Sequence, residues 1–336
     1  MVKSFIKSIA LLACAQWLIA CQEPIDLELE DNVPELVIEG YLTQRDYLIP
    51  DEGFDCGAGF SLSKSEIKFA TDIADAFLDI DSIEAQTDYF PFNKVQLTTT
   101  ANYFSEGSSP RVSGAAVRLM KDGALVEILE EDPNEIGTYR ITHFPEVGSY
   151  YHLEVEALNA FYETTPELYK AVPPLIVLPD LPNVTYKSNF IGDSCQYFVG
   201  INTYEPIGKG DHYRWMFYLN NEYVSDPVFI ATFDDSDVDG VCLLQFDIYG
   251  NPLQLSDTLI VFQMSTSEGY SGFINSFRNQ TAFVGGPFDT PPAPIPGNIK
   301  NVTTGTDAYG YFICGGISAT AVIVPDTIPS GGCGIE

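Results

Sequence analysis

The chain has 336 residues, of which 47 are acidic and 16 are Lys or Arg, so its formal net charge at pH 7 is −31. Such a surface repels nucleic acid and anionic lipid, which excludes a nucleic-acid-binding function. Hydrophobic residues make up 45% of the chain, enough for folded cores, which excludes a disordered protein. A chain of this length is longer than a domain with one small hydrophobic core, so we expect two domains.

The first 20 residues have the organisation of an export signal. Lys3 and Lys7 precede an apolar run over 9–19, which is too short to span a bilayer as a helix. The run ends in Leu18-Ile19-Ala20-Cys21. This ending resembles the lipobox of bacterial lipoproteins, where a diacylglycerol is attached to the cysteine and the signal is cleaved before it. We therefore expect lipidation of Cys21; the alternative is an ordinary secretory signal with a chance cysteine.

Residues 21–33 predict a tether, because they are acidic and contain a proline. Alternating apolar residues then predict a first domain over 34–172, an Ig-like β-sandwich in which Asp122-Gly123 forms a hairpin turn. Its strands are expected at 36–43, 95–100, 116–121, 124–129, 137–141 and 151–157. Residues 61–86 have helix-like apolar spacing and predict a surface insertion.

A proline-rich linker over 173–183 is expected to separate this domain from a second β-rich domain over 184–336. One short helix is expected within 267–280. The strands of this part are expected at 197–201, 213–219, 228–233, 241–249, 259–264, 309–312 and 319–324. The sequence thus predicts a mainly β protein with two sandwich-like domains and little helix.

Five cysteines follow Cys21, namely Cys56, Cys195, Cys242, Cys314 and Cys333. Pairing is expected because an exported protein meets an oxidising compartment. Since five is odd, at least one thiol must be free or intermolecular, and the connectivity stays open.

No pattern in the chain indicates an enzyme. The three histidines, His143, His152 and His212, are more typical of structural or surface positions. The patterns of zinc proteases, nucleophile elbows and phosphate-binding loops do not occur. We therefore expect a non-enzymatic protein and assign no catalytic residue.

An Asp-x-Asp-x-Asp-Gly pattern at 235–240 suggests a calcium site. Asp235, Asp237 and Asp239 could converge on a hard cation. The twelfth position of such a loop is Phe246, which cannot bind calcium, so Asp247 is the candidate that would complete the site. The alternative, which we favour, is a solvated acidic turn.

Three Asp-Ser/Thr-aliphatic triplets resemble the sites that Bacteroidota O-glycosylate on exported proteins. The candidate glycosylation sites in these triplets are Ser82, Thr258 and Thr327. The pattern is short and arises easily by chance.

Several pieces of the chain resemble a Bacteroidota lipoprotein family, domain of unknown function 4249. The pieces are Glu35-Leu36-Val37-Ile38-Glu39-Gly40, Val112-Ser113-Gly114-Ala115-Ala116-Val117, Gly148-Ser149-Tyr150-Tyr151-His152-Leu153, Pro291-Pro292-Ala293-Pro294-Ile295-Pro296-Gly297-Asn298-Ile299 and Gly310-Tyr311-Phe312. The segment 46–93 is longer than the usual link of the family. The family has no assigned activity, but its members resemble accessory surface lipoproteins encoded beside TonB-dependent receptors.

The resemblance implies a lipid-anchored outer-membrane protein at the cell surface. We expect it to bind a ligand, or to act as an accessory, beside a TonB-dependent β-barrel receptor. An adhesin or structural envelope lipoprotein is the alternative. A hydrolase ranks last because no nucleophile–base set is visible.

Overall fold

A computed structural model describes residues 34–45, 54–55, 61–62, 92–101, 107–170, 183–189, 192–281, 293, 295 and 297–326. The mainly β class is confirmed, because strand residues far outnumber helical residues in these ranges. The expected signal, the tether, Cys21 and most of the expected insertion lie outside these residues. Within the described ranges, no helix has the length and apolar character needed to cross a membrane.

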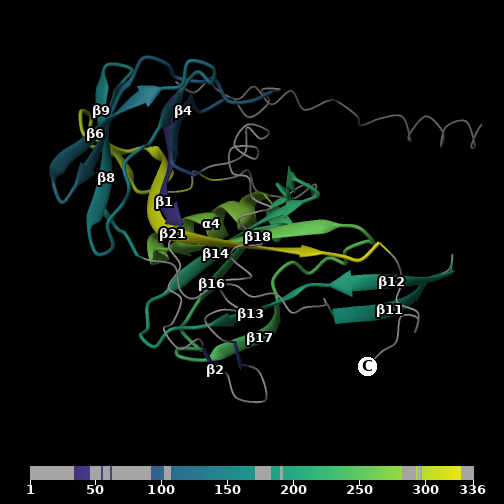
Figure 1. The fold of residues 1–336 in the computed structure, drawn as a ribbon. Coiled ribbons are helices and arrows are strands. Elements are labelled where there is room, and N and C mark those ends of the chain that lie inside the picture. Colours follow the sequence, from purple (N-terminus) through teal and green to yellow (C-terminus); the bar gives the residue numbers. More distant parts are fainter. Residues whose placement is uncertain are drawn as a thin grey trace, which may run out of the picture.

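Antiparallel pairing dominates the fold, and one large sheet contains most of its strands (Figure 1). The N-terminal strands are β1 (Leu36–Arg45), β2 (Phe54–Asp55), β3 (Ser61–Leu62), β4 (Lys94–Thr99), β5 (Ala116–Lys121), β6 (Ala124–Glu131), β7 (Thr138–Arg140), β8 (Tyr150–Ala157), β9 (Ala160–Thr164) and β10 (Glu167–Leu168). The later elements are β11 (Asn183–Asn189), β12 (Gly192–Phe198), β13 (Gly200–Tyr204), β14 (His212–Leu219), β15 (Glu222–Tyr223), the 3-10 helix η1 (Pro227–Phe229), β16 (Ala231–Asp234), β17 (Cys242–Asp247), β18 (Thr258–Thr266), α4 (Glu268–Thr281), β19 (Ile299–Asn301), β20 (Thr306–Asp307) and β21 (Tyr309–Ile323).

The first core lies between strands of the N-terminal half. Strand β1 alternates as expected for a half-buried strand, with Leu36, Ile38 and Leu42 buried in this core. The C-terminal residues Ile299 and Phe312 are buried in the same core. Residues from both predicted domains therefore build it, while the predicted boundary at 173–183 stays a prediction.

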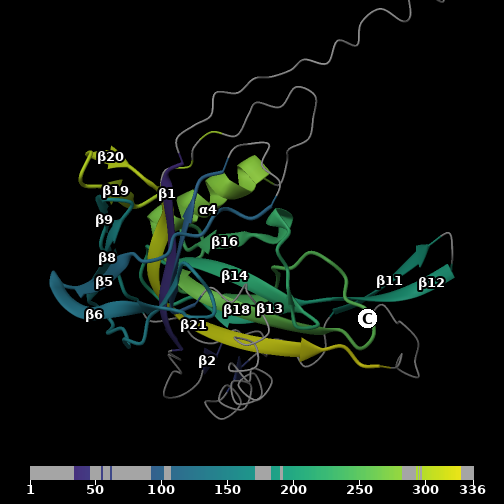
Figure 2. The same cartoon turned by 90° about the horizontal axis from the view of Figure 1, so that it is seen from above.

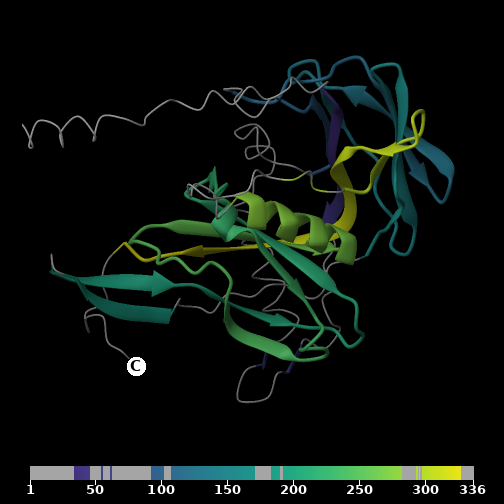
Figure 3. The same ribbon diagram turned by 180° about the vertical axis from the view of Figure 1, so that it is seen from behind.

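The second part of the molecule has three layers (Figure 3). Its central sheet is formed by β14, β18 and β21. Met216 and Tyr218 of β14 pack on one face, in the cluster that includes residues of α4. Trp215 and Phe217 pack on the other face with residues of β12, β13 and β17. Figure 2 shows the β11–β12 hairpin on the side of the molecule away from the N-terminal strands.

Strand β21 joins the two parts. It pairs in parallel with β1 along 309–317 and antiparallel with β18 along 317–323. A Cβ added at Gly315 would lie 1.9 Å from the backbone oxygen of Ser265, so only glycine allows this close approach of two strands.

Most of the expected strands and the expected helix are confirmed, but three expectations are wrong in detail. The 228–233 strand is instead η1 followed by β16. Pro227 has no N–H to donate to a ladder, and Asp226 Oδ1 accepts a hydrogen bond from Val228 N at 3.0 Å. The two strands expected over 309–324 are one 15-residue strand. Residues 61–62, expected to begin a helix, form β3.

The close approach at Gly315 predicts a large effect of Gly315→Ala. Because a backbone oxygen cannot move aside cheaply, we expect the free energy of unfolding to fall by about 2–4 kcal/mol. Gly272→Ala is the control, since it lies within α4 and a Cβ there meets nothing within 4 Å; it should stabilise by about 0.5–1 kcal/mol. Urea denaturation of both variants measures the difference, and equal stabilities would contradict the role of Gly315.

Candidate functional site

A cluster of carboxylates forms where β13 and β16 end and β14 begins. Glu205 follows β13, Asp211 precedes β14 and Asp235 follows β16. Antiparallel pairing of β14 and β16 sets His212 opposite Asp234, which brings Asp211 and Asp235 together. One oxygen from each of the three carboxylates lies within 4.8 Å of the others. Two oxygens on one calcium ion lie at most about 5 Å apart, so these three residues could hold such a cation.

Much of this charge is already engaged by the protein. Both carboxylate oxygens of Asp235 accept a hydrogen bond from the Gly210 N–H, at 3.0 and 2.9 Å. Asp239 Oδ1 accepts one from Gly208 N at 2.7 Å. Lys170 Nζ lies 3.4 Å from Asp211 Oδ1. The acidic turn therefore holds the 208–210 loop in place, whether or not it binds a cation.

Glu205 is the most strongly perturbed carboxyl of the cluster. Its side chain is buried, and Tyr213 Oη donates a hydrogen bond to its Oε1 at 3.1 Å. Burial raises the pKa of Glu205 to about 7; the Tyr213 hydrogen bond lowers it, and the negative charges of Asp211, Asp235 and Asp239 raise it. Glu205 thus binds a proton more tightly in the folded protein than in the unfolded chain.

The four calcium ligands that the sequence suggested do not lie together in the structure. Asp235 belongs to the cluster, and Asp239 lies close enough to act on the Glu205 charge. Asp237 is exposed. Asp247 lies in β17, where its Oδ1 accepts a hydrogen bond from Gly250 N at 2.8 Å. Glu205 and Asp211 were missed because they lie 30 and 24 residues before Asp235 in the sequence.

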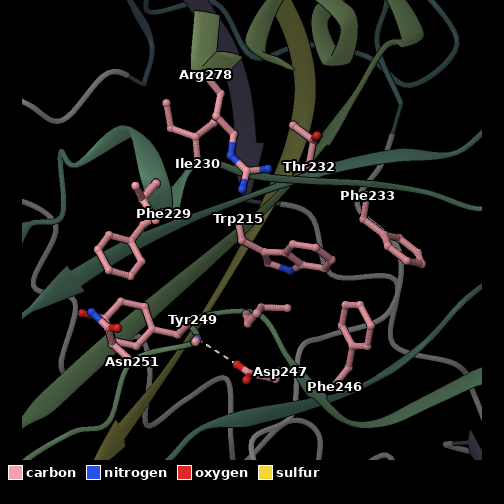
Figure 4. A pocket seen from close by; sticks show the side chains of 13 residues that line it. Trp215, Phe229, Ile230, Thr232, Phe233, Phe246, Asp247, Tyr249, Asn251 and Arg278 are labelled. Atoms are coloured by element: carbon pink, nitrogen blue, oxygen red, sulfur yellow. Dashed lines mark hydrogen bonds between the residues drawn. The ribbon is translucent and has the colours of Figure 1, made fainter. Parts of the chain in front are cut away.

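A second feature lies farther along β14 and β16. It is a pocket of about 410 Å³, within the usual range for small-molecule sites. Five aromatic side chains line it, together with the polar residues Thr232, Asp247, Asn251 and Arg278 (Figure 4). The aromatic residues are Trp215, Phe229, Phe233, Phe246 and Tyr249.

The aromatic residues form two groups on opposite sides of the pocket (Figure 4). Phe229 and Tyr249 are stacked, with ring centroids 5.2 Å apart and planes 25° apart. Trp215, Phe233 and Phe246 pack against one another, with centroids 5.5–6.1 Å apart. A hydrogen bond also holds the Trp215 indole in position, because its Nε1 donates to Gln263 Oε1 at 3.0 Å. The walls are therefore preformed by packing.

Arg278 is the cation of the pocket. It comes from the last turn of α4, and Figure 4 shows its guanidinium pointing toward Trp215. Its Nε is buried without a hydrogen-bond partner, and no described carboxylate forms an ion pair with it. A cation is favoured at a helix C-terminus, but that preference does not require Nε to be buried. A buried donor without a partner costs about 1–3 kcal/mol.

The remaining sequence candidates lie apart from both features. Thr258 begins β18, where its backbone N–H donates to Asn220 Oδ1 at 2.9 Å. His143 Nε2 lies 3.2 Å from Tyr151 Oη, and His152 Nε2 lies 3.6 Å from Glu163 Oε1. Ser82 and Thr327 lie outside the described residues, so the glycosylation hypothesis stays a prediction.

The states of two cysteines agree with the expectation that at least one of the five cysteines after Cys21 stays unpaired within the chain. Cys314 is a free, buried thiol in the first core. Cys242 takes part in a disulfide.

The raised pKa of Glu205 predicts a pH dependence of stability. The stabilisation is present below the unfolded pKa of 4.5 and is lost as pH rises through about 7. In calcium-free buffer, Glu205→Gln should remove a decline of about 2 kcal/mol between pH 5 and 8. Urea denaturation across that range measures it. Glu222→Gln, at an exposed glutamate of β15, is the matched control and should keep the decline; parallel curves for both variants would contradict the assignment.

The calcium hypothesis also stays a prediction, and the structure changes its test. The calcium hypothesis predicts that about 10 mM calcium raises the melting temperature by about 2–5 °C, as for a site with a dissociation constant on the order of 1 mM. Asp235→Asn should lose this increase, whereas Asp237→Asn should keep it because that side chain is exposed outside the cluster. An absent shift in the wild type, or its loss only in Asp237→Asn, would contradict this ligand set.

One of the comparisons with known proteins identifies a family, and none of them assigns an activity. A family model described as Domain of unknown function (DUF4249) matches residues 92–320. The searches of curated proteins and of solved structures found no match. The matched region includes the carboxylate cluster, the aromatic pocket and most of β21. Because the match covers more than half of the chain, this protein belongs to the DUF4249 family.

Proposed function

We propose that this protein is a non-enzymatic, ligand-binding lipoprotein of the outer membrane, displayed at the cell surface as an accessory of a TonB-dependent receptor. The aromatic pocket is the observation that carries ligand binding. It has the size and the apolar walls of a small-molecule site, with a few polar groups to orient a ligand.

The arrangement of the pocket supports binding more than catalysis. Its lining includes one carboxylate and one guanidinium, but no histidine, cysteine, serine or lysine. Asp247 is exposed and already accepts the Gly250 hydrogen bond. Nothing in this set pairs a nucleophile with a base, whereas the aromatic residues can bury most of a small ligand.

Anchoring and display are supported by the sequence. Lipidation at Cys21 would leave the 13 residues 21–33 as a tether, which spans at most about 45 Å when fully extended. The folded body would then be held near the membrane while its pocket remains open to the surroundings. The net charge of −31 favours a soluble body that is repelled by anionic surfaces.

The anchoring and the partner are tested together by purifying the native protein from outer membranes in mild detergent. We expect a lipidated N-terminus at Cys21 by intact mass, and a TonB-dependent β-barrel receptor at near-equal amounts by mass spectrometry. Cys21→Ala should lose the lipid mass and leave the membrane fraction. Recovery of the lipidated protein alone would contradict the receptor assignment and favour the adhesin alternative.

A further inference from the structure

We propose that the aromatic pocket binds a compound with a planar ring body and one carboxylate, and that Arg278 binds the carboxylate. This inference rests on the proposed ligand-binding function and deepens it by naming the ligand class. It follows from the aromatic residues on the two sides of the pocket and from Arg278, which forms no ion pair with a described carboxylate.

The walls select a flat apolar body. Phe229 and Tyr249 on one side, and Trp215, Phe233 and Phe246 on the other, offer ring faces and edges to the cavity (Figure 4). Aromatic rings interact best with other rings, in offset-stacked or edge-to-face contacts. A cavity of about 410 Å³ accommodates a compound of two fused rings with its head group.

Arg278 selects the head group. Arg278 lines the pocket and forms no ion pair with a described carboxylate, so its guanidinium offers the pocket a positive charge that the described residues do not neutralise. The planar guanidinium carries paired N–H donors that match the two oxygens of a carboxylate. A phosphate carries more charge and more acceptors than this single arginine can satisfy, so the geometry favours the carboxylate.

The position of the one acidic residue in the lining, Asp247, agrees with a ligand whose carboxylate lies at Arg278. Asp247 would repel an anion, but Figure 4 places it at the end of the pocket opposite Arg278. Its Oδ1 is engaged by Gly250 N at 2.8 Å. The ring body would therefore separate the ligand carboxylate from the only acidic side chain of the lining.

The test compares 2-naphthoate with 2-naphthamide, which has nearly the same shape but no charge. Calorimetric titration of the folded wild-type protein should show saturable binding of both compounds, with naphthoate bound at least about tenfold more tightly. Arg278→Gln should weaken naphthoate binding about tenfold and leave naphthamide binding unchanged. Arg118→Gln is the matched control for charge, because Arg118 lies on β5 and pairs with Glu156; it should change neither affinity.

A second pair of variants tests the pocket itself. Val228 lines the pocket with 49% of its surface exposed, so Val228→Trp should block the cavity without disturbing the core. Val302, 45% exposed and outside the pocket lining, provides the control Val302→Trp. We expect Val228→Trp to abolish binding of both compounds and Val302→Trp to preserve it.

The outcomes distinguish the two levels of the proposal. Equal affinities for the two compounds, or naphthoate binding that survives Arg278→Gln, would overturn the carboxylate assignment and leave the ligand-binding pocket standing. Failure of both compounds to bind the wild type at millimolar concentration, or binding unaffected by Val228→Trp, would overturn the ligand class and the pocket function together.

Discussion

The structure depends on the double pairing of strand β21. Its first part completes the sheet of β1 in the N-terminal half, and its last part completes the sheet of β18 beside α4. Gly310 and Gly315 allow this, since a Cβ at either position would lie within 2.0 Å of a backbone oxygen of the neighbouring strand. One continuous strand therefore contributes side chains to the first core and to the clusters on both faces of the central sheet. The two parts of the molecule therefore cannot separate without breaking hydrogen bonds between β21 and either β1 or β18.

A buried polar network fixes α4 against this strand. Arg214 Nη1 donates to the hydroxyl oxygens of Tyr41, at 3.1 Å, and of Tyr270 in the first turn of α4. Tyr270 and Tyr311 of β21 form an edge-to-face pair, and Tyr311 Oη donates to Glu167 Oε1 at 2.7 Å. Burial raises the pKa of Glu167. Buried polar groups need such partners, so the network specifies how α4 sits on the sheet. Arg278 lies at the other end of this helix and owes its position over the pocket to the same contacts.

Strand β14 connects the core to both candidate sites. At its beginning, Tyr213 donates to Glu205 of the carboxylate cluster. Tyr213 also stacks on Phe233 of the pocket wall, with ring centroids 6.4 Å apart. Trp215, two residues farther along, forms part of that wall. A single strand buried on both faces thus positions a proton-binding carboxyl and an aromatic pocket next to each other.

Local sequence determined the class of the fold, most strand positions, helix α4 and the acidic turn after β16. These features depend on periodicity and turn chemistry among neighbouring residues. The sequence could not show which face of β14 meets the pocket, because nearly every residue of His212–Leu219 is apolar or aromatic and both faces are buried. Nor could it bring Glu205 to Asp235, or Arg278 to Trp215. Those contacts join residues that lie far apart in the chain, and they exist only because strand pairing and helix packing fix the register. Tertiary structure alone therefore decided the sites, since convergence of side chains is a property of the packed chain and not of its local pattern.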